Sequence, residues 1–414
     1  MKILACSDPI NTATGMAQQM RMMLEEVPAE WTYVENGAVV SPHSFSAGPK
    51  PFETKNGKMM VHPGMNMKTR SYCLRTLADL AKKDDYDAMF LHDDPQYASV
   101  AYMTGWKMPV VYWFPYDSDT MFPSLAGTLD RFEKEHWKLC FMAKFPVKLA
   151  EMAGYKADFV YGIADNKAFC KMPEAGVESF KRKFSMTHGG CPMNRKILLF
   201  VGRNSPRKNI DGLISMAAAL EKKRKDFILI LRTSLQDPSP EAVDILSTIS
   251  NYHMEKHVVV DNADYLMPGY TKSYLNMLYN AADLYVSAAS GEGFGLPIAE
   301  AGLCGKTFVI PACTVSDEFM GDELRGFASP MNPGAFRRVR VSDLNGPPAI
   351  REMPLVDTEV MAENVDYLLG HEKKRDEMGE DFRKWVLANC SREVVAKKWS
   401  DILEDLNCGE VMAA

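Results

Sequence analysis

The sequence predicts an α/β protein made of two similar domains, each with a parallel sheet covered by helices. Short apolar runs alternate with amphipathic segments along most of the chain, a pattern typical of parallel strands joined by crossover helices. The chain has 414 residues, too many for one ordinary hydrophobic core, so two domains are expected. Its content of 46% hydrophobic and 25% charged residues is that of a soluble globular protein.

The first domain is expected to cover residues 1–190. Short apolar runs predict its strands at Ile3–Cys6, Trp31–Glu35, Ala38–Ser41, Tyr86–Leu91, Pro109–Phe114, Trp137–Met142 and Ala157–Tyr161. Helical spacing predicts helices over about Ala17–Glu26 and Thr69–Lys82. The stretch Pro42–Gly64 is rich in proline, glycine and asparagine, which indicates a long loop or an insertion.

The second domain is expected to cover residues 191–391, after a boundary near Phe184–Asn194. Its predicted strands are Ile197–Val201, Phe227–Leu231, Val258–Val260, Leu284–Ser287 and Thr307–Ile310. A loop and then an amphipathic helix are expected between Asp264 and Ala282. The stretch Phe327–Pro354 is proline-rich and is expected to be irregular, with Arg337–Arg340 on a solvated strand edge. The last predicted helix is Arg392–Leu406.

The segment Ser290–Glu300 is the most informative part of the chain. An apolar strand leads into a loop with three glycines, and Pro297 suits the first turn of the helix that follows. Free N–H groups and the dipole at a helix N-terminus favour an anion, and glycines allow its close approach. Glu300 can accept two hydrogen bonds from a vicinal diol such as a ribose, and Glu292 can contact a second ring. The segment therefore predicts a ligand with phosphate and hydroxyl groups; the alternative is a turn with solvated acids.

A second segment agrees with this interpretation. Gly202 and Arg203 follow the predicted strand Ile197–Val201, and Lys208 comes just before a helix. A cationic loop that enters a helix is a diphosphate-binding arrangement. Taken alone, such a loop is more often solvated surface, so the interpretation depends on the acidic motif lying nearby.

Both segments resemble motifs of retaining glycosyltransferases with the GT-B fold, most of all family 4 (glycosyl transferases group 1). Glu292 and Glu300 match the E-x7-E motif, and Ala301–Lys306 resembles the segment EAMACGKP, with a threonine in place of the usual proline. Arg203 and Lys208 match the motif G-R-x4-K-G, although an asparagine, residue 209, stands where the family prefers glycine. The resemblance implies two Rossmann-like domains facing across a cleft, with the C-terminal helix, about 392–414, crossing back onto the first domain.

The resemblance also implies roles for individual residues. Glu292 would lie beside the donor sugar, and Arg203 and Lys208 would neutralise the leaving nucleotide. His92 would lie near the reacting carbon and Asp117 would orient the acceptor, giving the candidate catalytic set; Asp117 in a structural turn, and helix capping by Asp93 or Asp94, are the alternatives. The implied donor-binding residues are Gly15, Gly202, Gly293, Phe294, Gly295, Leu296, Glu300, Tyr265 and Leu266. Of these, Gly15 is a weak match, and the 264–267 loop would face the base.

The implied reaction needs no cofactor. A nucleotide-diphosphate sugar is the donor, a hydroxyl of a glycan, lipid, small molecule, protein or modified DNA base is the acceptor, and the anomeric configuration is retained. Arg203, Lys208 and the helix N-terminus would offset the charge on the departing phosphate, so no obligatory metal is expected. Asp117-Ser118-Asp119 has the letters of a metal-binding D-x-D motif, but it lies in the acceptor-side domain and is interpreted as a chance match.

Composition narrows the remaining choices. No run of about 18 apolar residues occurs, and the first residues are too soon polar for a signal peptide. Nine cysteines without a C-x-x-C pair are typical of reduced thiols, so the expected location is cytoplasmic. Three alternatives stay open: another GT-B enzyme, a virus-type glycosyltransferase that modifies a hydroxylated DNA base, and a non-enzymatic protein that binds nucleotide sugars. The basic runs at 181–183 and 337–340 permit DNA binding, whereas the net charge of −6 speaks against it.

Overall fold

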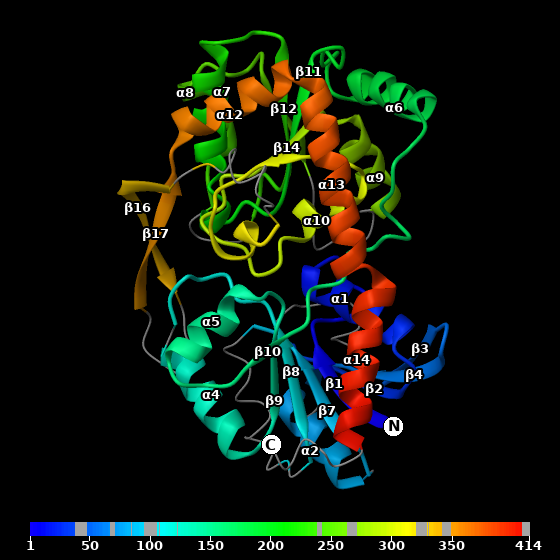
Figure 1. Ribbon diagram of the computed structural model, residues 1–414. Coiled ribbons are helices and arrows are strands. Elements are labelled where there is room, and N and C mark those ends of the chain that lie inside the picture. Colours follow the sequence, from blue (N-terminus) through cyan, green and yellow to red (C-terminus); the bar gives the residue numbers. More distant parts are fainter. Residues whose placement is uncertain are drawn as a thin grey trace.

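Two sheets, one in each half of the chain, form the framework of the computed structural model (Figure 1). The structure describes residues 1–37, 48–66, 71–83, 85–94, 106, 108–121, 123–237, 242–262, 271–319, 329, 331–341 and 349–407. The predicted strand Ala38–Ser41 and the predicted donor-binding residues Tyr265 and Leu266 lie outside these ranges.

The first sheet has the strand order β10-β9-β8-β7-β1-β2-β4-β3 and is parallel except for β3. Its strands are β1 (Lys2–Ser7), β2 (Glu30–Glu35), β3 (Lys50–Thr54), β4 (Gly57–His62), β7 (Ala88–His92), β8 (Val110–Phe114), β9 (Lys138–Phe141) and β10 (Asp158–Phe159). The helices of this half are α1 (Gly15–Glu26), α2 (Cys73–Lys83), α4 (Pro123–Lys134) and α5 (Phe145–Met152), and a small pair, β5 (Met65–Asn66) and β6 (Ser71–Tyr72), precedes α2. Every residue of β7 and β8 is buried, as expected for strands covered on both faces.

Pro42–Gly64 was predicted to be a long loop or an insertion, and its described part is a strand hairpin, not a loop. β3 and β4 form an antiparallel hairpin that extends the sheet at its edge. Lys55 and Asn56 form the turn, and Gly57, the first residue of β4, adopts φ +120°, which L side chains rarely adopt. Met59 and Val61 are buried while Met60 is 42% exposed, which is the alternation expected of a strand with one buried face. The sequence prediction missed this alternation because it relied on the proline, glycine and asparagine content of the stretch.

The second sheet has the order β13-β12-β11-β14-β15 and is wholly parallel. Its strands are β11 (Lys196–Val201), β12 (Phe227–Thr233), β13 (Val258–Asn262), β14 (Leu284–Val286) and β15 (Phe308–Val309), close to the predicted ranges. The helices of this half are α6 (Glu174–Thr187), α7 (Ile210–Glu221), α8 (Ile245–Asn251), α9 (Lys272–Ala281), α10 (Leu296–Leu303) and α12 (Thr358–Gly370), with short 3-10 turns η3 (Pro206–Lys208) and η4 (Thr314–Asp317). Helix α6 packs on α9 through Phe180 and Tyr274, whose ring centroids are 5.6 Å apart.

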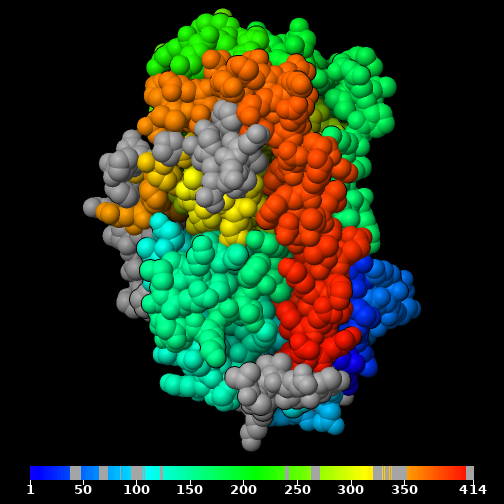
Figure 2. Space-filling view, viewed as in Figure 1, coloured from blue at the N-terminus to red at the C-terminus, as the bar shows by residue number. Residues whose placement is uncertain are grey.

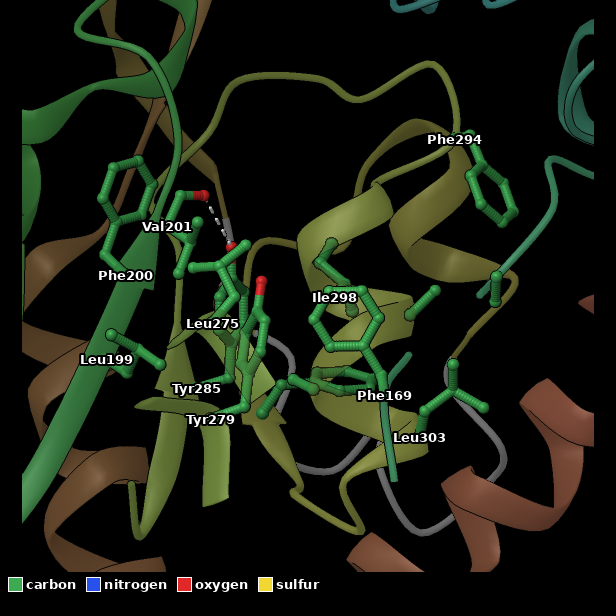
Figure 3. Close-up of a cluster of buried hydrophobic side chains, with 14 of the residues drawn as sticks. Phe169, Leu199, Phe200, Val201, Leu275, Tyr279, Tyr285, Phe294, Ile298 and Leu303 are labelled. Atoms are coloured by element: carbon green, nitrogen blue, oxygen red, sulfur yellow. Dashed lines mark hydrogen bonds between the residues drawn. The ribbon is translucent and has the colours of Figure 1, made fainter. Parts of the chain in front are cut away.

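A buried cluster of large side chains supports the strands and helices of the second half (Figure 3). Ile298 and Leu303 of α10 pack near Phe169, and Tyr279 and Tyr285 lie between them and β11. The Tyr285 hydroxyl donates to the Val201 carbonyl at 3.4 Å, the bond dashed in Figure 3. This cluster fixes the position of α10 against the carboxyl ends of β11 and β14.

The C-terminal helices cross from the second half onto the first, as the resemblance implies. Helix α13 (Glu372–Cys390) runs down one side of the molecule and α14 (Arg392–Asn407) continues along the first half (Figures 1 and 2). The Arg392 guanidinium binds Asp165 at 2.7 Å and Glu25 at 2.6 Å. Trp399 is fully buried, with ring centroids 5.4 Å from Trp113. The two halves are thereby tied together by a charge cluster and an aromatic contact.

Residues 331–341 and 349–356 correct a further expectation. They form the strands β16 (Met331–Val341) and β17 (Ala349–Val356), an antiparallel hairpin that stands beside the second domain (Figure 1). Arg337 is not on a solvated edge, because its side chain is only 20% exposed and binds Asp211 of α7. The prolines led to a prediction of irregular chain, yet prolines are tolerated at the edges of a two-stranded hairpin.

Candidate active site

Two loops meet at the carboxyl ends of β11 and β14. These strands are parallel neighbours, so the loop after β11 and the loop after β14 lie at the same edge of the sheet. The Ser290 N–H donates to the Arg207 carbonyl at 2.9 Å, and the Asn209 side chain donates to the Ala288 carbonyl at 3.2 Å. The basic segment and the acid-flanked glycine segment of the sequence are therefore bound to one another.

Glu292 forms the centre of this site. Lys208 Nζ contacts its Oε1, and Arg207 Nη1 lies 2.9 Å from its Oε2. The Glu292 N–H donates to the Thr314 hydroxyl at 2.9 Å. Burial opposes ionisation of this carboxyl, which is 6% exposed, but Lys208 and Arg207 outweigh that effect and lower its pKa. The carboxylate is thus held charged between two cations.

Arg207 is the site residue that the sequence motif did not identify. Its guanidinium bridges the two domains, since Nε lies 2.8 Å from Asp117 Oδ2 after β8, and Nη1 donates to Glu292. Burial would lower its pKa, but Glu292 and Asp117 raise it above the ordinary value. The position falls within the unspecified x4 of the motif. The sequence feature that could have identified Arg207 is its place next to Lys208, in the turn that begins at Pro206.

Arg203 takes a different place. Its side chain is 57% exposed and forms a two-point ion pair with Asp237, at 2.9 and 3.1 Å. The structure brings Lys208 and Glu292 together with Asp117, whereas Arg203 contacts the segment after β12. Gly202 follows β11 directly, and its N–H donates to the Arg232 carbonyl at 3.1 Å. A diphosphate role for Arg203 stays a prediction.

Glu300 lies in the second turn of α10. The helix begins after Gly295, which caps it at φ +76°, a left-handed conformation that favours glycine. Glu300 is 5% exposed and accepts a hydrogen bond from the Tyr279 hydroxyl at 2.8 Å. Burial raises the pKa of its carboxyl to about 7, which the Tyr279 bond only partly offsets. Its charge therefore changes near neutral pH.

The glycine segment is also where the two domains touch. A Cβ on Gly293 would lie 2.4 Å from Pro115 Cβ, so only glycine permits this approach. The buried ring of Phe294 packs on Gly162, where a Cβ would lie 2.3 Å from it, and its centroid is 6.0 Å from that of Phe319. A Cβ on Gly15, at the start of α1, would lie 3.5 Å from Leu296. The predicted donor-binding residues Gly15 and Leu296 thus meet across the domain boundary.

His92 ends β7 and is fully buried. Its Nδ1 lies 2.8 Å from the Trp113 carbonyl, which can only accept, so Nδ1 carries the proton and Nε2 keeps its lone pair. Burial lowers the pKa of the imidazole to about 4, so His92 is neutral at pH 7. Two residues further on, Asp94 is exposed, and the neighbouring carboxylate of Asp117 raises its pKa. The electrostatic coupling of Asp94 to Asp117 and Arg207 places this corner of the first domain next to the ion cluster.

Among the described residues, no group of three or more His, Cys, Asp or Glu side chains is arranged to hold a metal ion. Asp117, the first acid of the D-x-D letters, binds Arg207 instead. No helix within the described ranges is long and apolar enough to cross a membrane.

Residues 181–337 match the model of the family Glycosyl transferases group 1. Over 140 residues the chain is 30% identical to the D-inositol 3-phosphate glycosyltransferase of Salinispora arenicola (strain CNS-205). That match covers 34% of this chain and 31% of the relative, so the chain matches about a third of the length of that curated protein.

Similar solved structures extend over the whole chain. The structure of Anabaena Alr3699/HepE in complex with UDP-glucose has a TM-score of 0.72 at 14% identity, covering 98% of this chain and 100% of that one. Sucrose-phosphate synthase from Thermosynechococcus elongatus has a TM-score of 0.71 at 13% identity, covering 99% and 100%. At such identities the likeness shows the fold, two Rossmann-like domains in the GT-B arrangement.

Proposed function

We propose that this chain, whose residues 181–337 match the model of the family Glycosyl transferases group 1, moves a sugar from a UDP-sugar to a hydroxyl acceptor with retention of configuration. The observation that carries the proposal is the carboxylate of Glu292 held between Lys208 and Arg207, beside the N-terminus of α10. The structural relative HepE in complex with UDP-glucose supports a UDP-sugar as the donor.

In the proposed reaction, the bond between the anomeric carbon and the phosphate oxygen breaks. Negative charge develops on the departing diphosphate, where Lys208, Arg207 and the N–H groups at the start of α10 offset it. The acceptor hydroxyl attacks from the same face, and its proton passes to the departing phosphate oxygen. Glu292 faces the donor sugar, where its carboxylate accepts hydrogen bonds from hydroxyls. These fixed cations supply charge that other transferases draw from a metal ion, so no metal takes part in the proposal.

The first domain supplies the acceptor side. Asp117 orients the acceptor hydroxyl, and its contact with Arg207 couples that side to the donor. His92, neutral and with a free lone pair on Nε2, accepts a hydrogen bond from a hydroxyl near the reacting carbon. Contact between the domains at Gly293 and Pro115 excludes water, which limits hydrolysis of the donor.

A DNA-modifying enzyme is less consistent with the position of the basic run Lys181–Lys183. These residues line a groove with Arg195 and Lys196, at the amino end of β11. Lys208 follows the carboxyl end of the same strand. A duplex in this groove would therefore lie at the opposite end of the strand from the ion pairs of Lys208, Arg207 and Glu292. DNA binding with a steep dependence on salt would reverse this conclusion.

The proposal is tested by thermal-shift measurements with UDP-, GDP-, ADP- and dTDP-sugars. A ligand that binds only the folded state raises the melting temperature by mass action, and we expect UDP-sugars to give the largest rise. Glu300→Ala should remove that rise, because Glu300 is proposed to hold the ribose hydroxyls. The proposal fails if no nucleotide sugar stabilises the wild-type protein.

The pKa of Glu300 gives a pH-dependent prediction. Below about pH 7 the carboxyl is protonated and accepts ribose hydrogen bonds poorly, so UDP affinity should rise as the pH increases through 7. Affinity should change by up to about tenfold per pH unit on the acidic side. Calorimetric titration from about pH 5.5 to pH 8.5 measures this, with Glu300→Gln as the control that retains the titration of the phosphate itself. An equally steep profile in the glutamine variant would assign the dependence to another group.

A further inference from the structure

The hairpin β16–β17 reaches back to the loop that carries Arg207 and Lys208. Arg337 of β16 donates from Nη1 to the Pro206 carbonyl at 2.9 Å. Its Nη2 donates to Asn209 Oδ1 at 3.1 Å and to Asp211 Oδ2 at 2.5 Å. One guanidinium therefore holds three groups that surround the η3 turn, and only 20% of its side chain is exposed.

The contacted groups are the two ends of that turn. Pro206 begins η3, and Asn209 ends it in the left-handed region at φ +52°. The Asn209 amide is engaged on both sides, since Nδ2 donates to the Ala288 carbonyl after β14 while Oδ1 accepts from Arg337. A non-glycine residue in this conformation is uncommon and needs support from its surroundings, which the two contacts of its side chain provide.

Asp211 adds an electrostatic reason for the contact. It lies in the first turn of α7, three residues after Lys208. A carboxylate there repels a nearby diphosphate, and the ion pair with Arg337 offsets that repulsion. The charge of Asp211 is thereby compensated by a residue that lies 126 positions later in the chain.

We infer that Arg337 is a positioning residue of the donor site: through Pro206 and Asn209 it holds the turn that presents Arg207 and Lys208 to a nucleoside diphosphate. The inference rests on the proposed function. Arg337 touches the loop and not the ligand, so it increases affinity by fixing the loop in its binding geometry before the ligand arrives. The family match ends at residue 337, so Arg337 is its last matched residue, and the rest of β16 and all of β17 lie beyond it.

The test measures UDP affinity by calorimetry for Arg337→Ala, Arg337→Lys and a matched control, Arg224→Ala. Arg224 is a suitable match because 16% of its side chain is exposed, close to the value for Arg337. It binds Asp226 and Asp366 beyond the other end of α7. We expect roughly tenfold weaker UDP binding for Arg337→Ala, a smaller loss of about threefold for the lysine, and no change for Arg224→Ala. Lysine keeps the charge but cannot reach Pro206 and Asp211 together.

A double mutant separates positioning from general stability. Asn209→Gly keeps the left-handed turn without needing side-chain support, so Arg337→Ala should weaken UDP binding less in that background than in the wild type. Unchanged UDP affinity in Arg337→Ala, or losses that simply add, would overturn the inference. If Arg337→Ala does not fold, unchanged affinity in Arg337→Lys has the same meaning. Failure of the wild-type protein to bind UDP overturns the proposed function instead.

Discussion

Replacement of Lys208 by alanine is expected to lower the rate of UDP release from UDP-glucose by about 10²- to 10³-fold. Lys208 is 8% exposed and its ammonium group contacts Glu292, so its charge acts in surroundings with little water to screen it. Negative charge grows on the diphosphate as the sugar leaves, and a fixed cation stabilises that state more than it stabilises the bound donor. The rate is measured by coupled detection of UDP.

Two further variants show whether the effect is specific. Lys223→Ala removes a lysine of the same domain that pairs with Glu363 on the surface, and it should leave the rate unchanged. Arg203→Ala distinguishes two assignments of the second cation. A loss similar to that of Lys208→Ala would support the role that the motif implies for Arg203, while a small loss with a large effect of Arg207→Ala would assign that role to Arg207. A Lys208 variant with the wild-type rate would exclude this loop from the reaction.

The fold could be predicted where burial controls the sequence pattern. Strands β7, β8 and β11 are buried on both faces, so they appear as unbroken apolar runs and were found within two residues of their ends. Hairpins at the edges of a fold carry weaker patterns. The hairpins β3–β4 and β16–β17 contain prolines, glycines and charges, and their pairing depends on turns and tertiary contacts that composition does not reveal.

The candidate site could be predicted as loops but not as side-chain contacts. The motif spacing located the loops after β11 and β14, and Lys208, Glu292 and Glu300 are buried there. It could not show which arginine turns inward, because that depends on partners far away in sequence. Asp237 binds Arg203 at the surface, whereas Glu292 and Asp117 bind Arg207. The contact of Asp117 with Arg207 could not be predicted either, because it depends on how the two domains pack against each other.

Glu292 has two roles that can be separated. As a carboxylate near the donor sugar it accepts hydroxyl hydrogen bonds, and as the partner of Lys208 and Arg207 it neutralises the cations that are proposed to bind the diphosphate. A nucleoside diphosphate must therefore compete with Glu292 for the same two cations. Removal of the carboxylate charge should reduce turnover and yet favour the binding of a diphosphate without a sugar.

Glu292→Gln is therefore expected to reduce the rate of sugar release by about 10²-fold and to tighten the binding of UDP by roughly tenfold. Without ligand, the buried ammonium group of Lys208 loses its partner while Arg207 keeps its pair with Asp117, so the variant should be less stable by about 3 kcal/mol and melt at a lower temperature. UDP should restore more stability to the variant than to the wild type, and UDP-glucose should restore less than UDP because its sugar has lost a hydrogen-bond acceptor. Calorimetry and melting curves with both ligands measure these differences, and Glu363→Gln serves as a surface control. Weaker UDP binding in Glu292→Gln would mean that the carboxylate supports the diphosphate site instead of competing with it.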